Sequence, residues 1–226
     1  HHIAPASLLD SIRGFDEALN GCDAVYGEMH KDVMTSMESQ QRLGMALIAP
    51  ADSTLDKVFT PEEYAVVKQV FDGYYGAMGM PLERLNQVKP IGVSMQLQAI
   101  QARKVFANFS YNINEQIDAI VQSRGKEAGK ELGGFETLDD QISSMLGASI
   151  AEQAKGLYEA CALDKEFEEI SLKLCEAYIN QDLDYMHKQS VDPDAGSTPT
   201  EAELNRMLWN RNRNWVVKLK ELMPEK

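Results

Sequence analysis

The sequence contains little cysteine and no apolar segment long enough to cross a membrane. Only three of its 226 residues are cysteine, Cys22, Cys161 and Cys175, and no two of them form a Cys-x-x-Cys pair. This spacing excludes the common zinc and dithiol motifs, and we interpret all three as small core side chains. No apolar run approaches the roughly 18 residues that a spanning helix needs, so we expect no membrane span.

Basic residues are scarce relative to acidic ones. The chain has 22 Lys and Arg residues against 35 Asp and Glu residues, which gives a formal net charge of −13. Proteins that bind a phosphate backbone usually present a clustered basic face, and no such cluster occurs along this sequence. We therefore expect no nucleic-acid partner.

Several familiar catalytic motifs are missing as well. The sequence has no Gly-x-Ser-x-Gly elbow, no glycine-rich phosphate loop and no His-Glu-x-x-His helix. These absences exclude the common signatures of serine hydrolases, nucleotide-binding proteins and zinc proteases.

Helical periodicity dominates the chain. With 44% hydrophobic residues it is long enough to bury a core, and we expect a single domain over residues 1–226. Residues 60–63 and 198–201 each combine a capping hydroxyl, a proline and a carboxylate, which is typical of a helix start. Residues 7–20 predict one amphipathic helix, and residues 138–187 predict two or three packed helices.

Two short segments favour strands instead. Residues 22–30 and 130–136 are short, partly apolar and bounded by glycine or polar residues. We therefore predict an α/β fold that is predominantly helical, with a small β core. The last inward-facing residue of the first predicted strand is Glu28, and the second predicted strand ends at Glu136.

The last predicted helix carries an arginine on its apolar stripe. Arg211 is in register with five apolar residues, namely Leu204, Leu208, Trp215, Leu219 and Leu222. Because arginine does not lose its charge at ordinary pH, an arginine that faces a core needs an anion, usually a carboxylate. The alternatives are that Arg211 extends past Trp215 to solvent or forms a purely structural ion pair.

The glutamates at the strand ends are the next candidates. In open α/β sheets the ligand binds beyond the carboxyl ends of the strands, where we expect Glu28 unless it is a solvated loop residue. Glu136 is suited to sharing acid–base work or a metal, or to interacting with the N-terminus of the following helix. His30 would share a strand face with Glu28 if the strand continued, and that pair would suit a metal or a proton relay.

A set of short segments, taken in order, resembles the TraB/GumN family, which is related to the Tiki proteases. The segments are His2-Ile3-Ala4-Pro5, Ala18-Leu19 with Asp23 to Glu28, Val88-Lys89-Pro90, Glu115 to Gln141, Tyr178 with Asp182-Leu183, and Arg211-Asn212-Arg213-Asn214-Trp215. The segment from Glu115 to Gln141 is the most specific match. Together the segments cover nearly all of the chain.

The resemblance implies an α/β core with a long helical insertion and an active site made of two Gly-x-x-His motifs, one glutamate and one arginine. On this chain the corresponding residues are His2, Glu28 and Arg211, with Asn212 beside the arginine as a secondary candidate. The glycine of the first motif would precede His1, and no second Gly-x-x-His motif follows Trp215. We therefore expect a domain truncated at both ends and nearly inactive as a fragment, unless His1 and His2 are tag residues.

The resemblance also implies a function. Tiki proteins are thought to be metal-dependent proteases, and the more distant erythromycin esterases hydrolyse esters. We therefore expect a metal-assisted hydrolase of peptide or ester bonds, acting on a peptide or small-molecule substrate. His2 and Glu28 would hold a divalent metal, and Arg211 would stabilise the developing oxyanion.

Two other classes of function fit the same residues. One is a non-catalytic protein that binds or regulates peptides, and the other is a helical scaffold in which Arg211 and Glu28 form a structural pair. Family relatives are often exported by bacteria. We accordingly expect a periplasmic or extracellular location, with the cytoplasm as the alternative.

Overall fold

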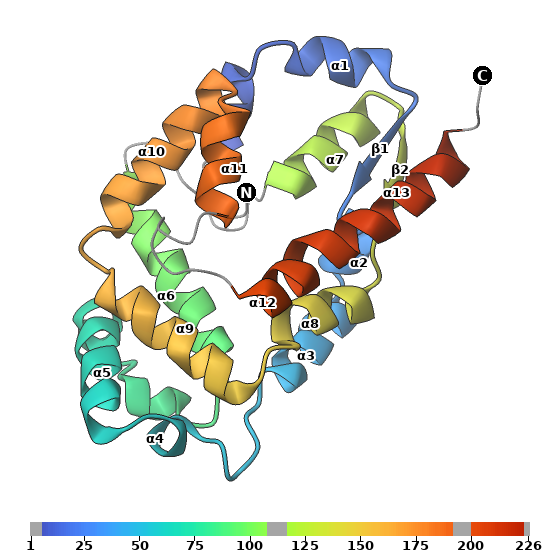
Figure 1. Ribbon diagram of the computed structural model, residues 1–226. Helices are drawn as coiled ribbons and strands as arrows, with labels where there is room; N and C mark the ends of the chain where they lie inside the picture. The colour runs from blue at the N-terminus through green and yellow to red at the C-terminus, as the bar shows by residue number, and fades with distance from the viewer. Residues whose placement is uncertain (1–5, 108–116, 192–199, 224–226) are drawn as a thin grey trace.

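Helices make up most of the fold (Figure 1). The computed structural model describes residues 6–107, 117–191 and 200–223. The α-helices are α1 (Phe15–Gly21), α2 (Lys31–Met34), α3 (Met37–Ala46), α4 (Leu55–Val58), α5 (Pro61–Tyr75), α6 (Pro90–Val105), α7 (Ile117–Glu127), α8 (Leu138–Leu146), α9 (Ile150–Ala162), α10 (Phe167–Asn180), α11 (Leu183–Val191), α12 (Glu201–Leu204) and α13 (Asn210–Leu222). Short 3-10 helices are η1 (Ala6–Ser11), η2 (Gly76–Met78) and η3 (Leu82–Leu85), and the π-helical turn η5 (Asn205–Trp209) joins α12 to α13. Across these residues no helix combines the length and apolar character needed to cross a membrane.

Among the described residues, four helices begin with a reciprocal capping box. Thr60, Thr137, Ser149 and Thr200 each accept a hydrogen bond from the backbone N–H three residues later, and the acidic side chain at that position accepts one from the cap. The exchange satisfies two backbone donors that the first turn leaves unpaired. The helix start predicted at residues 60–63 is confirmed. Of the start predicted at residues 198–201, Thr200 and Glu201 are described, and Thr200 caps α12, whereas Thr198 and Pro199 lie outside the described residues.

Two helix predictions need correction. Residues 7–20 form η1 and α1 rather than one helix, because the chain turns at Gly14, whose φ is 77°. Residues 138–187 hold four helices rather than two or three, and Gln181 ends α10 with a φ of 56°. In both places the apolar periodicity continues across a residue in the left-handed region, so the pattern alone conceals the break.

The two predicted strands are present and pair in parallel. Strand β1 (Ala24–Gly27) lies beside β2 (Glu131–Gly134), with Ala24 opposite Glu131 and Gly27 opposite Gly134. The described elements between them are helices, which confirms a predominantly helical fold with a small β core. Gly134 permits a close approach here, because a Cβ atom on it would lie 2.4 Å from the backbone nitrogen of His30.

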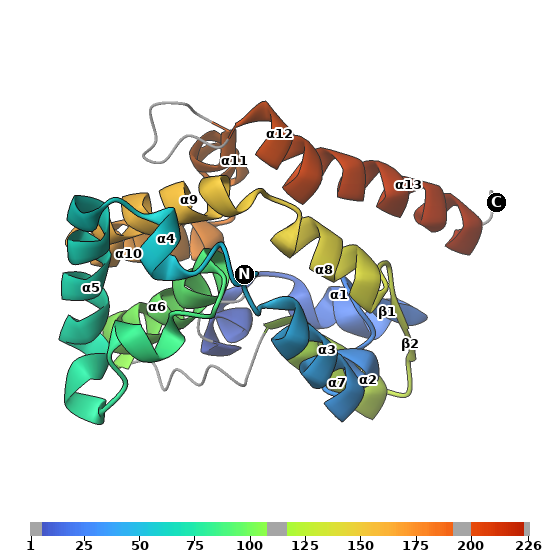
Figure 2. The ribbon, with the colours of Figure 1, turned by 90° about the horizontal axis from the view of Figure 1, so that it is seen from below.

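The main core lies at the opposite end of the molecule from the sheet (Figures 1 and 2). It packs α4, α5, α6 and α9 together through the buried residues Leu55, Phe59, Val67, Phe71, Leu82, Val93, Leu97, Ala154, Leu157 and Cys161. A smaller cluster joins η1, α7 and α10 and includes the partly buried Cys175. Both of these cysteines are core side chains, as predicted, whereas Cys22 is half-buried just before β1.

A polar cluster ties α5 and α6 to the corner that follows α9. The Tyr74 hydroxyl donates to Asp164 Oδ1 at 2.8 Å, and Gln101 Nε2 donates to the same oxygen at 2.7 Å. Burial and then the hydrogen bond to Asp164 raise the pKa of Tyr74 to about 12. One carboxylate therefore joins three segments that are distant in the sequence.

We expect Tyr74→Phe to lower the free energy of unfolding by about 1 kcal/mol at neutral pH, because Asp164 loses a hydrogen-bond donor. In the unfolded chain a tyrosine loses its proton near pH 10, whereas folded Tyr74 keeps it until about pH 12. Tyr74 thus lowers the free energy of unfolding of the native protein as the pH rises from about 10 to about 12. In Tyr74→Phe the free energy of unfolding should fall less over the same pH range. Urea unfolding at several pH values measures both effects. Tyr158→Phe is the control, because among the described residues the Tyr158 hydroxyl makes no hydrogen bond. An equal loss of unfolding free energy in both variants would contradict the prediction.

Candidate functional site

Glu28 and Glu136 meet at the carboxyl ends of the two parallel strands. Beyond Gly27 the backbone pairing continues, since Phe135 N donates to Gly27 O at 3.0 Å and Glu136 N donates to Glu28 O at 2.7 Å. This register brings two residues that are far apart in the sequence to the same edge of the sheet. The Glu28 side chain is 28% exposed, whereas that of Glu136 is only 5% exposed.

Arg211 lies between the two glutamates. Its Nη2 is 2.6 Å from Glu28 Oε2, and its Nε is 2.6 Å from Glu136 Oε1. A further hydrogen bond of 3.0 Å from Nη2 to Glu136 Oε2 makes the contact with Glu136 bidentate. Burial opposes the guanidinium charge, but the hydrogen bonds to Glu136 and Glu28 outweigh it and raise the pKa of Arg211. The carboxylate partner predicted for this arginine is therefore confirmed.

Trp215 lies one turn after Arg211 and completes the surroundings of Glu136. Its indole Nε1 donates to Glu136 Oε1 at 2.8 Å, and its ring lies 5.2 Å from the guanidinium carbon of Arg211. The other contact of the ring is with Phe135, at 5.5 Å between centroids. The indole thus both binds the buried carboxylate and covers the guanidinium, where cation–π attraction adds to the ion pairs.

Gln141 joins the two glutamates from α8. Its Nε2 donates to Glu28 Oε2 at 2.9 Å and to Glu136 Oε2 at 2.5 Å. Neither Gln141 nor Trp215 is among the site residues predicted from the sequence. Their positions in the sequence could have indicated both residues. Gln141 lies in the first turns of the helix that directly follows Glu136, and Trp215 lies on the same apolar stripe as Arg211.

A fully buried glutamine holds the loop after β1. Gln122 on α7 donates from Nε2 to Met29 O at 2.9 Å and accepts from Lys31 N at 2.9 Å through Oε1. These two contacts restrict the backbone on the C-terminal side of Glu28. They explain how a glutamate outside regular structure keeps a defined position.

A polar groove of about 570 Å³ opens beside this cluster. It lies between α8 and the segment that runs from η5 into α13, and this segment passes beside α8 in both views of the ribbon (Figures 1 and 2). Glu136 and Arg211 line it together with Ser143, Ser144 and Arg206. Glu136 and Arg211 therefore border a space in which a polar ligand fits.

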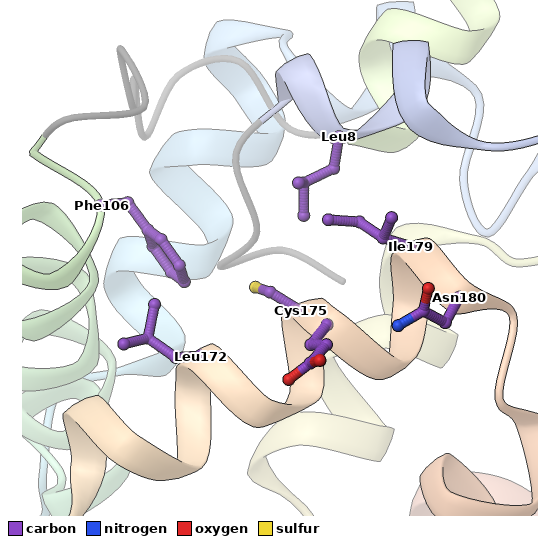
Figure 3. Close-up of a pocket in the computed structure, with 7 residues that line it drawn as sticks. Leu8, Phe106, Leu172, Cys175, Ile179 and Asn180 are labelled. Atoms are coloured by element: carbon purple, nitrogen blue, oxygen red, sulfur yellow. The ribbon is translucent and has the colours of Figure 1, made fainter.

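A smaller cavity of about 220 Å³ has a different character (Figure 3). Figure 3 shows the side chains of Leu8 and Ile179 pointing toward each other across it, with Phe106 and Leu172 close together at its other end. Its lining is mostly apolar and includes none of the residues predicted to act in catalysis. The polar groove is therefore the better candidate for a substrate.

Comparison with known proteins assigns the chain to a family. The model of the TraB/PrgY/gumN family matches residues 1–226, which is the whole chain. The chain belongs to the TraB/PrgY/gumN family. No curated protein and no solved structure matches it.

The remaining candidate residues are His2, His30 and Asn212. His2 lies outside the described residues. His30 does not share a strand face with Glu28, because β1 ends at Gly27 and His30 instead caps α2, accepting from Asp32 N at 3.2 Å through Nδ1. Asn212 is exposed on α13. Of the predicted residues, the structure thus brings together Glu28, Glu136 and Arg211.

The described part of this family member does not by itself form a metal site. Within residues 6–107, 117–191 and 200–223, no group of three His, Cys, Asp or Glu side chains is arranged to hold an ion. Glu28 and Glu136 both bind the guanidinium of Arg211. Since protein metal sites commonly supply three or four ligands, a metal bound at Glu28 would need further ligands such as His2.

Proposed function

We propose that this chain supplies the carboxylate and guanidinium groups of a hydrolase site that acts on peptide or ester bonds. The observation that carries the proposal is the contact of Arg211 with both Glu28 and Glu136 at the carboxyl ends of the strands. Ligands of open α/β sheets bind at this edge, and here a polar groove adjoins it. Membership of the TraB/PrgY/gumN family is consistent with this site.

The two glutamates are suited to different roles. Glu28 has the more exposed side chain, so we assign it the role of accepting a proton from the attacking water. Glu136 is nearly buried and accepts hydrogen bonds from Arg211, Trp215 and Gln141. We assign it the role of holding the guanidinium in place.

Arg211 is suited to stabilising the negative charge that develops on the substrate oxygen. A fixed cation does this best when it is positioned before the reaction begins. Its hydrogen bonds to Glu28, Glu136 and Met207 O engage most of its N–H groups and hold it firmly. The position of the guanidinium is therefore set before substrate binds.

A divalent metal is part of the proposal, with His2 and Glu28 as the residues that would hold it. Such an ion would supply Lewis acidity for the attack of water. Glu28 would then have to serve the metal and Arg211 together. Metal content is therefore measured alongside activity.

The test compares three forms of the whole protein: wild type, Glu28→Gln and Glu127→Gln. Glu127→Gln is the matched control, because it changes an exposed glutamate on α7. We expect the wild type to cleave a mixed peptide library and the Glu28→Gln variant to be slower by about 100-fold or more, since it loses the proton acceptor. Mass spectrometry of the products and elemental analysis of the protein measure cleavage and bound metal. Unchanged cleavage by Glu28→Gln would rule out the proposed role of this residue.

Peptide binding without turnover is the second candidate. It is favoured by the fact that both carboxylates already bind Arg211 and Gln141, an arrangement that is complete without a reacting group. Saturable binding of peptides by a metal-free wild type that cleaves none of them would support it. For either function we propose a periplasmic or extracellular location, with the cytoplasm as the alternative, to be checked by cell fractionation.

A further inference from the structure

The helix that carries Arg211 contains a π-helical turn, and this turn determines where Arg206 lies. Arg206 belongs to η5 and precedes Arg211 by five residues. In a regular α-helix, side chains five residues apart point about 140° away from each other. A π-helical turn closes hydrogen bonds between residues five apart, which returns such residues to nearly the same side. Both arginines accordingly line the polar groove.

The stem of Arg206 is held against the end of α8. Its Nε donates to Ser144 O at 3.1 Å. Gly147 lies beneath the stem, and a Cβ atom on this residue would be 2.9 Å from Arg206 Cδ. The arginine is therefore seated by a backbone acceptor and by the absence of a side chain at Gly147.

The terminal nitrogens of Arg206 differ from its Nε in their contacts. Within the part of the chain that the structure describes, they have no hydrogen-bond acceptor, and Arg206 forms no ion pair. The nearby Glu152 caps α9, and its pKa is lowered mainly by hydrogen bonds with Ser149 and less by the charge of Arg206. Arg206 is thus a positioned cation without a carboxylate bound to it.

The acidic groups that line the groove near Arg206 are already engaged. Glu136 binds Arg211, and Asp140 accepts hydrogen bonds from Thr137 N at 2.8 Å and from Thr137 Oγ1 at 2.7 Å. The remaining acidic residue, Glu221, lies at the far end of α13, fifteen positions after Arg206 in the sequence. An anionic group that entered the groove would therefore meet Arg206 without having to displace a protein carboxylate.

We propose that Arg206 determines substrate specificity by binding a carboxylate of the substrate. A guanidinium forms paired hydrogen bonds with a carboxylate, and the terminal nitrogens of Arg206 are available for them. The proposal rests on the hydrolase function proposed above, because it places this carboxylate in the groove bordered by Arg211 and Glu136. The carboxylate has two possible sources, the C-terminus of a peptide or an Asp or Glu side chain.

The experiment measures the binding of peptide probes to the whole protein that carries the Glu28→Gln substitution, so that cleavage does not consume the peptides. The probes are random octapeptide pools with a free or an amidated C-terminus, each prepared with and without Asp and Glu. Peptides retained by the immobilised protein are quantified by mass spectrometry. The same selection is repeated with Arg206→Gln and with Arg213→Gln, the control that changes an exposed arginine on the same helix.

We expect carboxylate-bearing pools to be retained about ten times better than pools without a carboxylate, a ratio that corresponds to one charge-assisted contact. Arg206→Gln should remove the preference and Arg213→Gln should keep it. The pool that is preferentially retained shows whether the bound carboxylate is the peptide C-terminus or an Asp or Glu side chain. Absence of any preference, or a preference that persists in Arg206→Gln, would overturn the proposal. Should Arg206→Gln fail to fold, Arg206→Lys serves instead and should reduce the preference several-fold, because lysine does not bind bidentately.

The outcomes separate this inference from the proposed function. Cleavage by the wild type without a carboxylate preference would reject the role of Arg206 and leave the hydrolase standing. A preference that depends on Arg206, in a wild type that cleaves nothing, would reject the hydrolase and leave the binding site standing.

Discussion

Arg211→Ala is expected to lower the free energy of unfolding by about 3 kcal/mol and to abolish the proposed hydrolysis. The substitution leaves Glu28 and Glu136 facing each other without a cation, and Glu136 has little access to water that could compensate. Removing one partner of a buried ion pair usually costs about 3–5 kcal/mol, and the partial exposure of Glu28 favours the lower end. Urea unfolding followed by circular dichroism measures the loss of stability, and the peptide library measures the loss of activity.

Two further variants make this result specific. Arg213→Ala removes an exposed arginine of the same helix, whose Nη1 donates to Asn210 Oδ1 at 2.9 Å, and should change stability by no more than about 0.5 kcal/mol. Arg211→Lys keeps the charge but not the planar fork, so it should retain part of the stability and little of the activity. If Arg211→Ala and wild type unfolded at the same urea concentration, the ion pairs would not support the fold.

Gly134→Ala is expected to destabilise the protein by about 3 kcal/mol and to disturb the site. A Cβ atom at this position would lie 2.4 Å from His30 N and 2.9 Å from Met29 C. These are backbone atoms, and Gln122 holds them in place through Met29 O and Lys31 N, so the clash is not relieved by rotating a side chain. Overpacking commonly costs about 1–3 kcal/mol, and a rigid neighbour places this case at the upper end. Thermal and urea unfolding give the size of the effect.

Gly156→Ala is the matched control for this prediction. Gly156 lies inside α9, and a Cβ atom there would meet nothing within 4 Å. Alanine in the middle of a helix is more stable than glycine by about 0.5–1 kcal/mol, so this variant should be more stable than wild type. A Gly134→Ala protein as stable as wild type would show that the loop at Met29 and His30 moves aside easily.

Much of the site follows from local features of the sequence. Glu28 and Glu136 are recognisable because each follows a short segment bounded by turn residues, and parallel strands place their carboxyl ends at one edge. Arg211 is recognisable because a charge on an apolar stripe needs a partner. These are properties of neighbouring residues, or of a helical period, and they do not depend on the rest of the chain.

Other features of the site were not predicted from the sequence. His30 becomes a helix cap rather than a partner of Glu28, because the strand ends three residues earlier. Gln141 joins the site because α8 begins directly after Glu136, and Arg206 faces the groove only because η5 is π-helical. Helical periodicity does not predict a π-helical turn, since it assumes one constant number of residues per turn.

The sequence by itself determined the helix caps, the two strands and the need of Arg211 for an anion, because each results from hydrogen bonding or periodicity over a few residues. Only the tertiary structure decided that two carboxylates share one guanidinium and that a groove beside them contains a second arginine. Those arrangements depend on the parallel register of β1 and β2 and on the packing of η5 against α8, which bring together side chains more than 60 positions apart in the chain.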